Sequence, residues 1–148
     1  APDYIKRIRP GFMLTQTGFG FGLVDSCIEL MKHTNVSKGH VNQFLDDQAK
    51  DIEADLEIAR SRTYALADEI GCGEVTLRPN IIRDVIEVRI AASELALRAS
   101  QAAMLHAGAN GYRLHCVYER KLRESYFVAI VTPALKHLKK LLHEMPAA

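Results

Sequence analysis

Six histidines, three cysteines and a run of acidic residues are the side chains of this sequence with the chemistry to bind a metal or act as nucleophiles. The histidines form neither an HExxH motif nor the ExxH pair that di-iron bundles use. Cys27, Cys72 and Cys116 are odd in number and widely spaced, so they make neither a disulfide framework nor a CxxC metal knuckle. We therefore expect no metal site, and we interpret the cysteines as reduced thiols of a cytoplasmic protein.

The histidines are expected at the surface or at helix ends. They are His33, His40, His106, His115, His137 and His143. His115 and Cys116 are adjacent, but a nucleophilic pair needs a spatial contact that sequence neighbours seldom make, so we interpret both as loop residues. The acidic run lies between Asp46 and Glu57. Such a run has the ligands for a cation, but it is more commonly the solvated face of a helix.

Glycines are concentrated in two places, at Gly18, Gly20 and Gly22 and again between Gly108 and Gly111. A glycine in a helix costs about 1 kcal/mol relative to alanine, so the first group indicates close packing against another helix. A phosphate loop is the alternative there, but no strand precedes the group and no GK[ST] follows it. On the residues alone, the second group is typical of a helix-ending turn.

Apolar residues recur at helical spacing along the whole chain, with no strand-like alternation and no internal repeat. The second predicted helix has an apolar face along its length and ends at the turn Gly71-Cys72-Gly73. The face comprises Val41, Leu45, Ile52, Leu56, Ala59, Thr63, Leu66 and Ile70. The predicted helices span about 10–33, 40–70, 78–106, 118–131 and 134–144, with a polar turn at 34–39 and a loop at 107–117. The sequence therefore predicts an all-α, up-and-down four-helix bundle with a short extra C-terminal helix.

Three details of this arrangement are also predicted. Pro10 suits the first turn of the first helix. Small residues on more than one face of the 78–106 helix place that helix centrally, with other helices packed closely around it. Thr132 and Pro133 are typical of an N-cap followed by a first-turn proline, so Thr132 is expected to cap the last helix.

The 148 residues are 48% hydrophobic and 25% charged, with a net charge of +1, which indicates one ordinary globular domain, 1–148. We expect no nucleic-acid partner, because the charge is near zero and aromatic residues are not interleaved with basic ones. We expect no membrane span, because no apolar run is long enough. Ala1-Pro2-Asp3 opens the sequence without an initiator Met, from which we expect an expressed or proteolytic fragment.

One ordered set of residues resembles the C-terminal domain of the acyl-CoA dehydrogenase family of flavoproteins. That family has a GGxG-aromatic loop, a segment like ExxxRD, and an isoleucine shortly before its catalytic loop. Arg9-Pro10 and Leu56 to Arg60 also match, so the resemblance covers nearly the whole chain. The matching set is Gly108-Ala109-Asn110-Gly111-Tyr112, Glu119-Arg120, Arg123-Glu124 and Ile130.

The resemblance implies an FAD-dependent oxidoreductase of fatty acid metabolism whose preceding helical and β domains complete the flavin and acyl-CoA sites. It implies a homodimer or homotetramer in which this bundle forms the contact between copies. It places Gly108, Asn110 and Gly111 against the cofactor, where glycines let backbone N–H groups approach an anion. It places Lys32 where an FAD-binding arginine stands in the family, although a basic residue that satisfies the C-terminus of the first helix explains Lys32 at least as well, and it makes Arg9 a candidate for substrate binding.

The departures from the family pattern bear on the chemistry. The family's catalytic glutamate would fall at Thr132, and a neutral hydroxyl is too weak a base to remove the α-proton of an acyl thioester. The alternative position for that glutamate, just ahead of Arg9, holds Ile8. Asn35-Val36 replace a Phe-Gly pair, and Leu105 replaces a glutamine. Glu119 and Glu124 are explained by helical ion pairs with Arg123 and Arg120.

Three hypotheses follow from the sequence. The first is the C-terminal domain of an acyl-CoA dehydrogenase-like enzyme, inactive when isolated and without bound cofactor. The second is a branch of the same family that reacts reduced flavin with oxygen, as the family's monooxygenases do. The third is a non-catalytic helical module that self-associates.

Overall fold

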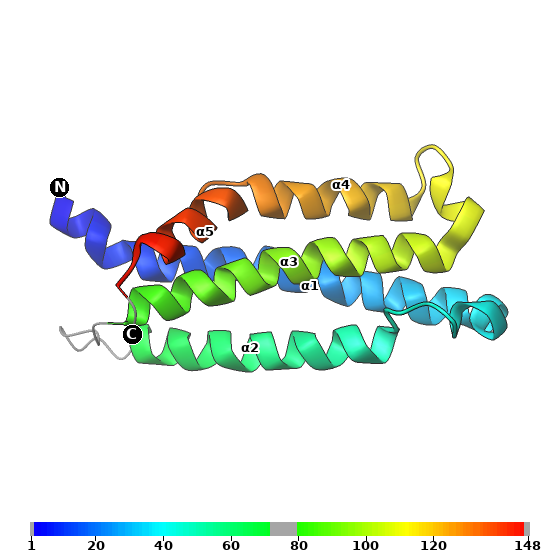
Figure 1. Cartoon of the computed structure of the whole chain (residues 1–148), viewed down its shortest axis with the longest axis horizontal. Helices are drawn as coiled ribbons and strands as arrows, with labels where there is room; N and C mark the ends of the chain where they lie inside the picture. Colours follow the sequence, from blue (N-terminus) through cyan, green and yellow to red (C-terminus); the bar gives the residue numbers. More distant parts are fainter. Residues whose placement is uncertain (1, 72–79, 147–148) are drawn as a thin grey trace.

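The computed structural model describes residues 2–71 and 80–146, and within these ranges the chain consists of helices and short connections (Figure 1). The all-α bundle predicted from the sequence is confirmed. The elements are α1 (Pro2–Asn42), α2 (Ala49–Gly71), α3 (Ile81–Ala107), the 3-10 helix η1 (Gly108–Tyr112), α4 (Val117–Ile130) and α5 (Leu135–Glu144). No helix in the described ranges has both the length and the apolar character needed to cross a bilayer.

Helix α3 is the centre of the bundle, as its small residues predict. It contacts α1, α2, α4 and α5. Figure 1 shows α4 and α5 along one edge and α2 along the opposite edge, with α1 and α3 between them. The alanines of α3 are buried on several faces because neighbouring helices approach it from more than one side. The buried alanines are Ala92, Ala96, Ala99, Ala102, Ala103 and Ala107.

Helix α1 is longer at both ends than the predicted 10–33, and the predicted polar turn at 34–39 is wrong. Pro10 lies inside α1 instead of in its first turn. The segment 34–39 stays helical because its polar side chains find partners across the bundle. Lys38 donates a hydrogen bond to the oxygen of Ala107, and Asn35 Oδ1 lies 3.0 Å from His106 Nδ1. These contacts to the end of α3 outweigh the weak helix propensity of the segment.

The chain turns at 43–48, and α2 therefore begins at Ala49 instead of His40. Gln48 closes this turn, because its side-chain nitrogen donates to the backbone oxygens of Asn42 and Leu45, at 2.9 and 2.7 Å. The predicted buried face of α2 holds at Ile52, Leu56, Thr63 and Leu66. Val41 does not belong to that face, since it lies on α1 and is exposed.

The expectation of close packing at the first glycine group holds only at Gly20. A β-carbon there would lie 2.9 Å from the backbone oxygen of Ala92 on α3. Nothing lies within 4 Å of the corresponding positions at Gly18 and Gly22. At the end of α2, Gly71 is the last helical residue, and the rest of the predicted Gly71-Cys72-Gly73 turn lies outside the described residues. The predicted start of the third helix at Arg78-Pro79 lies outside them as well.

The predicted N-cap at Thr132 is wrong. Helix α5 begins at Leu135, its N-cap residue is Ala134, and no side chain caps it. Thr132 and Pro133 form instead the connection between α4 and α5, joined by a cis peptide bond. The bundle holds Thr132 by its backbone oxygen and not by its hydroxyl, because Gln16 Nε2 donates to that oxygen at 2.9 Å. The N-cap of α5 therefore lies at Ala134 instead of Thr132.

Replacing Thr132 with alanine is expected to change the free energy of unfolding by less than about 0.5 kcal/mol. The Thr132 side chain is exposed and caps no helix, and alanine retains the backbone oxygen that accepts from Gln16. Urea unfolding followed by circular dichroism measures the difference. A loss of about 1 kcal/mol or more would reinstate Thr132 as an N-cap.

Candidate functional site

The connection between α4 and α5, which we call the α4–α5 corner (residues 131–134), contains the residue at which the family resemblance places its catalytic carboxylate. Thr132 is exposed there. The corner is closed by the hydrogen bond from the Val131 N–H to the oxygen of Phe127, at 2.8 Å. Together with the contact from Gln16, this bond attaches the corner both to α4 and to α1.

A buried cation lies beneath the corner. Arg89 of α3 is 0% exposed and donates from Nη2 to the oxygen of Val128 at 2.9 Å, and from Nη1 to Ser93 Oγ. Its Nε lies 3.5 Å from Gln16 Oε1. Among the described residues no carboxylate forms an ion pair with Arg89, and burial lowers the pKa of its guanidinium. Sequence analysis missed this arginine, whose only signal is a charge on the helix predicted to be central.

Exposed phenylalanines lie on α1 and α4, the two helices that Gln16 and Val131 connect to the corner. Phe12 and Phe19 of α1 are 57% and 59% exposed, and Phe127 of α4 is 62% exposed. Phe19 and Phe127 line one shallow cavity of about 280 Å³ with Lys121 and Glu124 at its edge. Apolar side chains are therefore exposed within one turn of Gln16 on α1, and at Phe127, whose oxygen accepts from Val131 of the corner. Ile5, Ile8 and Ile130 extend the exposed apolar set.

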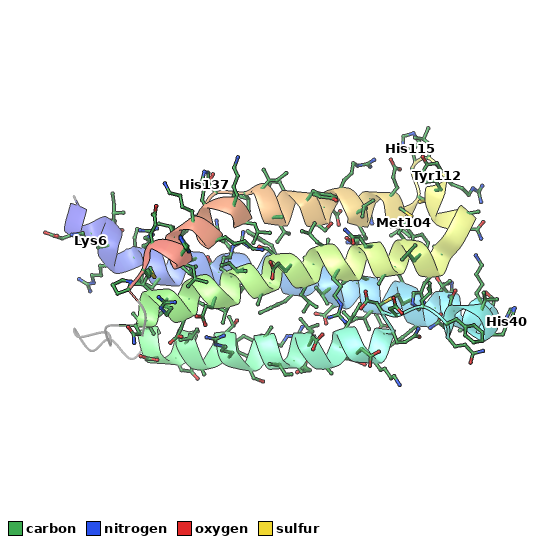
Figure 2. The ribbon with its side chains drawn as sticks, viewed as in Figure 1. Lys6, His40, Met104, Tyr112, His115 and His137 are labelled. Atoms are coloured by element: carbon green, nitrogen blue, oxygen red, sulfur yellow. The ribbon has the colours of Figure 1, made fainter. Side chains whose placement is uncertain are left out.

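The glycine loop forms the 3-10 helix η1 at the opposite end of the bundle from α5, where Figure 2 shows Tyr112 and His115 projecting at the turn between α3 and α4. Gly108 has φ +61°, a conformation that favours glycine. At Gly111 a β-carbon would lie 2.7 Å from Met104 Sδ. Asn110 is exposed beside them. Gly108 is thus required by its backbone conformation and Gly111 by the close approach of Met104, which the sequence alternative of a helix-ending turn also explains.

Lys38 is the cation beside this loop. Its Nζ donates to the oxygen of Ala107 at 2.6 Å and lies 4.0 Å from the position of a β-carbon on Gly108. Sequence analysis named Lys32 instead. Lys32 Nζ contacts Glu53 on α2 at 2.9 Å and Glu29 at 3.4 Å, and the hydrogen bond to Glu53 is the main cause that raises the pKa of this lysine. Its charge is therefore balanced by two carboxylates.

The remaining family positions, on α1 and α3, have different environments. Arg9 is exposed on the N-terminal part of α1, and Leu105 is exposed near the end of α3. Asn35, which replaces the family's phenylalanine, is used inside the protein, where its Oδ1 accepts from Asn42 Nδ2 at 2.8 Å. Val36 is exposed. The structure therefore groups the glycine loop with the end of α1, but it does not bring Lys32 or Arg9 to that loop.

The predicted ion pairs on α4 are confirmed. Glu119 pairs with Arg123, and Arg120 lies 3.5 Å from Glu124, which also pairs with Lys121 at 2.8 Å. The acidic run is only partly a solvated face. Asp47 and Asp55 both bind Arg98 of α3, at 2.6 and 2.5 Å, so part of the run connects helices.

One histidine departs from the expected surface or helix-end position. His106 is in the last turn of α3, as expected of a helix-end residue, but its side chain is buried. It is buried because its two ring nitrogens lie within hydrogen-bond distance of Asn35 Oδ1 and the Asp47 oxygen. His33, His40, His115, His137 and His143 are exposed, and the part of the chain that the structure describes contains no group of three or more metal-ligating side chains.

The two described cysteines have different environments. Cys27 is buried, and burial raises the pKa of its thiol to about 11, so it carries little thiolate at neutral pH. Cys116 is the N-cap of α4, where its sulfur accepts from the Glu119 N–H and donates to the Gly111 oxygen. The expected loop role of His115 and Cys116 is thus a structural one. Cys72 lies outside the described residues.

A groove between α1 and α2 was not predicted. It encloses about 580 Å³, and Gly11, Gly18 and Gly22 line its α1 side. The Asp25–Arg60 ion pair, at 2.7 Å, lies in its lining, and the Arg60 guanidinium carbon lies 6.0 Å from the centre of the Phe21 ring. The spacing of the glycines by seven and four residues was the available signal, because it puts all three on one side of a helix.

No protein-family model matches the sequence, and no curated protein matches it.

Proposed function

We propose that this chain is the C-terminal helical-bundle domain of an acyl-CoA dehydrogenase-like, FAD-dependent oxidoreductase. In that enzyme it would contribute the contact between copies and part of the flavin and acyl-CoA sites. The observation that carries the proposal is the α4–α5 corner. The resemblance aligns Thr132 with the family's catalytic residue, Gln16 of α1 holds the corner, and Phe12, Phe19 and Phe127 are exposed on the two helices that this contact joins.

The exposed apolar face supports an acyl substrate. Three phenylalanines in water forgo the favourable free energy of burial, at about 25 cal/mol per Å² of apolar surface. An acyl chain and the neighbouring domains of the longer enzyme would cover that surface. Apolar side chains with a few polar groups among them are also the usual composition of a small-molecule site, where the polar groups fix the orientation of the ligand.

The glycine loop fits an anionic cofactor in part. Gly108 and Asn110 are exposed, Gly108 has no side chain to obstruct its backbone, and Lys38 adds a positive charge beside the loop. Gly111 does not fit this role, because it is buried against Met104 and Ala107. Lys32 does not fit the role of a flavin-phosphate ligand, because its charge is balanced by Glu29 and Glu53. FAD would supply the hydride acceptor. The residues of this chain would hold the cofactor's anionic edge and orient the acyl group.

The corner has no carboxylate to serve as the base. Glu119 and Glu124, the nearest acids in sequence on α4, are paired with Arg123 and Lys121. A threonine hydroxyl can donate a hydrogen bond to a carbonyl oxygen but does not remove an α-proton at neutral pH. This observation favours, as the second candidate, a monooxygenase-type branch of the family in which reduced flavin reacts with oxygen.

Two preparations test the proposal. The isolated chain is expected to be colourless and to lack dehydrogenase activity, because the preceding domains that complete the sites are missing. The longer protein that the proposal implies, expressed from the native reading frame, is expected to carry flavin and to show a change in its flavin spectrum when acyl-CoA is added. If acyl-CoA bleaches the flavin of the Thr132→Glu/Pro133→Gly variant but not the flavin of the unmodified protein, the result would support the interpretation that the catalytic base is missing.

The outcomes separate the hypotheses. A longer protein without flavin that sediments as a dimer or tetramer would overturn the enzyme proposal and favour a self-associating helical module. Flavin bleaching by acyl-CoA in the unmodified longer protein would show that a base lies elsewhere. A yellow isolated chain would contradict the requirement for the preceding domains.

A further inference from the structure

We infer that Gln16 and Arg89 are positioning residues that fix the α4–α5 corner against α1, so that Thr132 is held at a set place in the proposed acyl site. The inference rests on the proposed function in one respect, that the corner faces the acyl substrate. It assigns no contact with substrate to either residue, because both are buried.

The Gln16 side-chain amide has a defined orientation. Its Nε2 donates to the Thr132 oxygen at 2.9 Å, and its Oε1 faces Arg89 Nε at 3.5 Å. The two ends of an amide differ, since one donates and the other accepts. A guanidinium only donates, so it selects the orientation that directs the Gln16 nitrogen toward the corner.

The other end of the Arg89 guanidinium binds the end of α4. Arg89 Nη2 donates to the Val128 oxygen at 2.9 Å, in the last turn of α4, where the carbonyl groups favour a cation. Arg89 therefore holds the end of α4 while it orients Gln16. The corner lies between these two attachments, so its position relative to both α1 and α3 is fixed.

Burying the charge of Arg89 between α1, α3 and α4 has a free-energy cost. A buried cation without a carboxylate partner is less favourable than an apolar side chain of similar length. Filling space between α1, α3 and α4 is therefore insufficient to explain Arg89. Its directed hydrogen bonds to Gln16 and Val128 supply what an apolar residue lacks, which is a defined geometry for the corner.

Gln16→Glu tests the inference, because a carboxylate keeps the partner of Arg89 but loses the donor to the Thr132 oxygen. Amide hydrogen exchange of the isolated chain is the measurement. The Val131 amide is expected to exchange at least about tenfold faster, while amides in the middle of α3, such as Ala96, stay within about twofold of wild type. Gln101→Glu, at an exposed position on α3, is the matched control and is expected to leave both sites unchanged.

Gln16→Met is the second variant, for use if Gln16→Glu does not fold. Its side chain is nearly as long as that of glutamine but makes neither hydrogen bond, and it is expected to give the same faster exchange at Val131. Unchanged exchange at Val131, or an equal rise at Val131 and Ala96, would overturn the positioning role. The first result would show that the contact holds nothing, and the second that the residue only stabilises the whole domain.

The longer protein supplies the functional readout. Gln16→Glu is expected to raise by at least about tenfold the acyl-CoA concentration that half-saturates the flavin spectral change, with flavin content unchanged. An unchanged concentration together with a loosened corner would overturn the role toward substrate. Absence of flavin from the unmodified protein would instead refute the proposed function, and hydrogen exchange would still decide whether Gln16 and Arg89 fix the corner.

Discussion

His106→Leu is expected to lower the free energy of unfolding by about 2–4 kcal/mol. The His106 side chain is buried between α1, the 43–48 turn and the end of α3. Its Nδ1 lies 3.0 Å from Asn35 Oδ1 and its Nε2 lies 2.9 Å from the Asp47 oxygen. Leucine fills similar volume but has no hydrogen-bonding group. Asn35 Oδ1 still accepts from Asn42 Nδ2, so the Asp47 oxygen is the one that loses its partner, and a polar group left unpaired in a buried site is costly. Urea unfolding measures the loss.

The control for this variant is His40→Leu, which changes an exposed histidine on the same α1–α3 end of the molecule (Figure 2). It is expected to alter the free energy of unfolding by less than about 0.5 kcal/mol. A His106→Leu variant as stable as wild type would show that His106 contributes only packing. An equally large loss in His40→Leu would show that the effect belongs to the leucine and not to the lost hydrogen bonds.

Gly20→Ala is expected to lower the free energy of unfolding by about 1–3 kcal/mol, although alanine is the better helix former. The added β-carbon would lie 2.9 Å from the Ala92 oxygen and 3.3 Å from the Ala92 β-carbon. Neither atom moves without shifting α3, because one is backbone and the other is attached directly to it. Thermal unfolding followed by circular dichroism provides the measurement.

Gly18→Ala and Gly22→Ala are the matched controls, since they make the same change in the same helix. Nothing lies within 4 Å of either added β-carbon, so both are expected to raise stability by up to about 1 kcal/mol. The opposite sign at Gly20 is the specific claim. If all three variants were stabilised, α1 and α3 would not be in close contact at Gly20.

The family resemblance identified positions along the chain, but it did not predict the structural environment of the residues there. Gly108 and Gly111 proved to be required by backbone conformation and by the contact with Met104. Lys32 proved to be paired with two acids, while Lys38, which sequence analysis did not single out, lies beside the glycine loop. Spacing along a helix states which side of it a lysine occupies, but not which neighbouring helix supplies its carboxylates.

The amino-acid sequence is enough to predict that the chain is helical, that it forms a bundle, and that the helix rich in alanine and serine lies at its centre. These follow from properties local to each segment: the period of the apolar residues, the helix propensities and the size of the side chains. It also determined the ion pairs on α4, because residues three or four apart on a helix are neighbours whatever surrounds them.

Contacts between helices set where α1 ends, which histidine is buried and what supports Thr132. Residues 34–39 are polar and looked like a turn, yet they remain helical because Asn35 and Lys38 bond to the end of α3, distant in sequence. The support of the corner joins Gln16, Arg89 and Val128 from three different helices. Such contacts depend on how helices pack side by side, and no local pattern of residue types encodes that register.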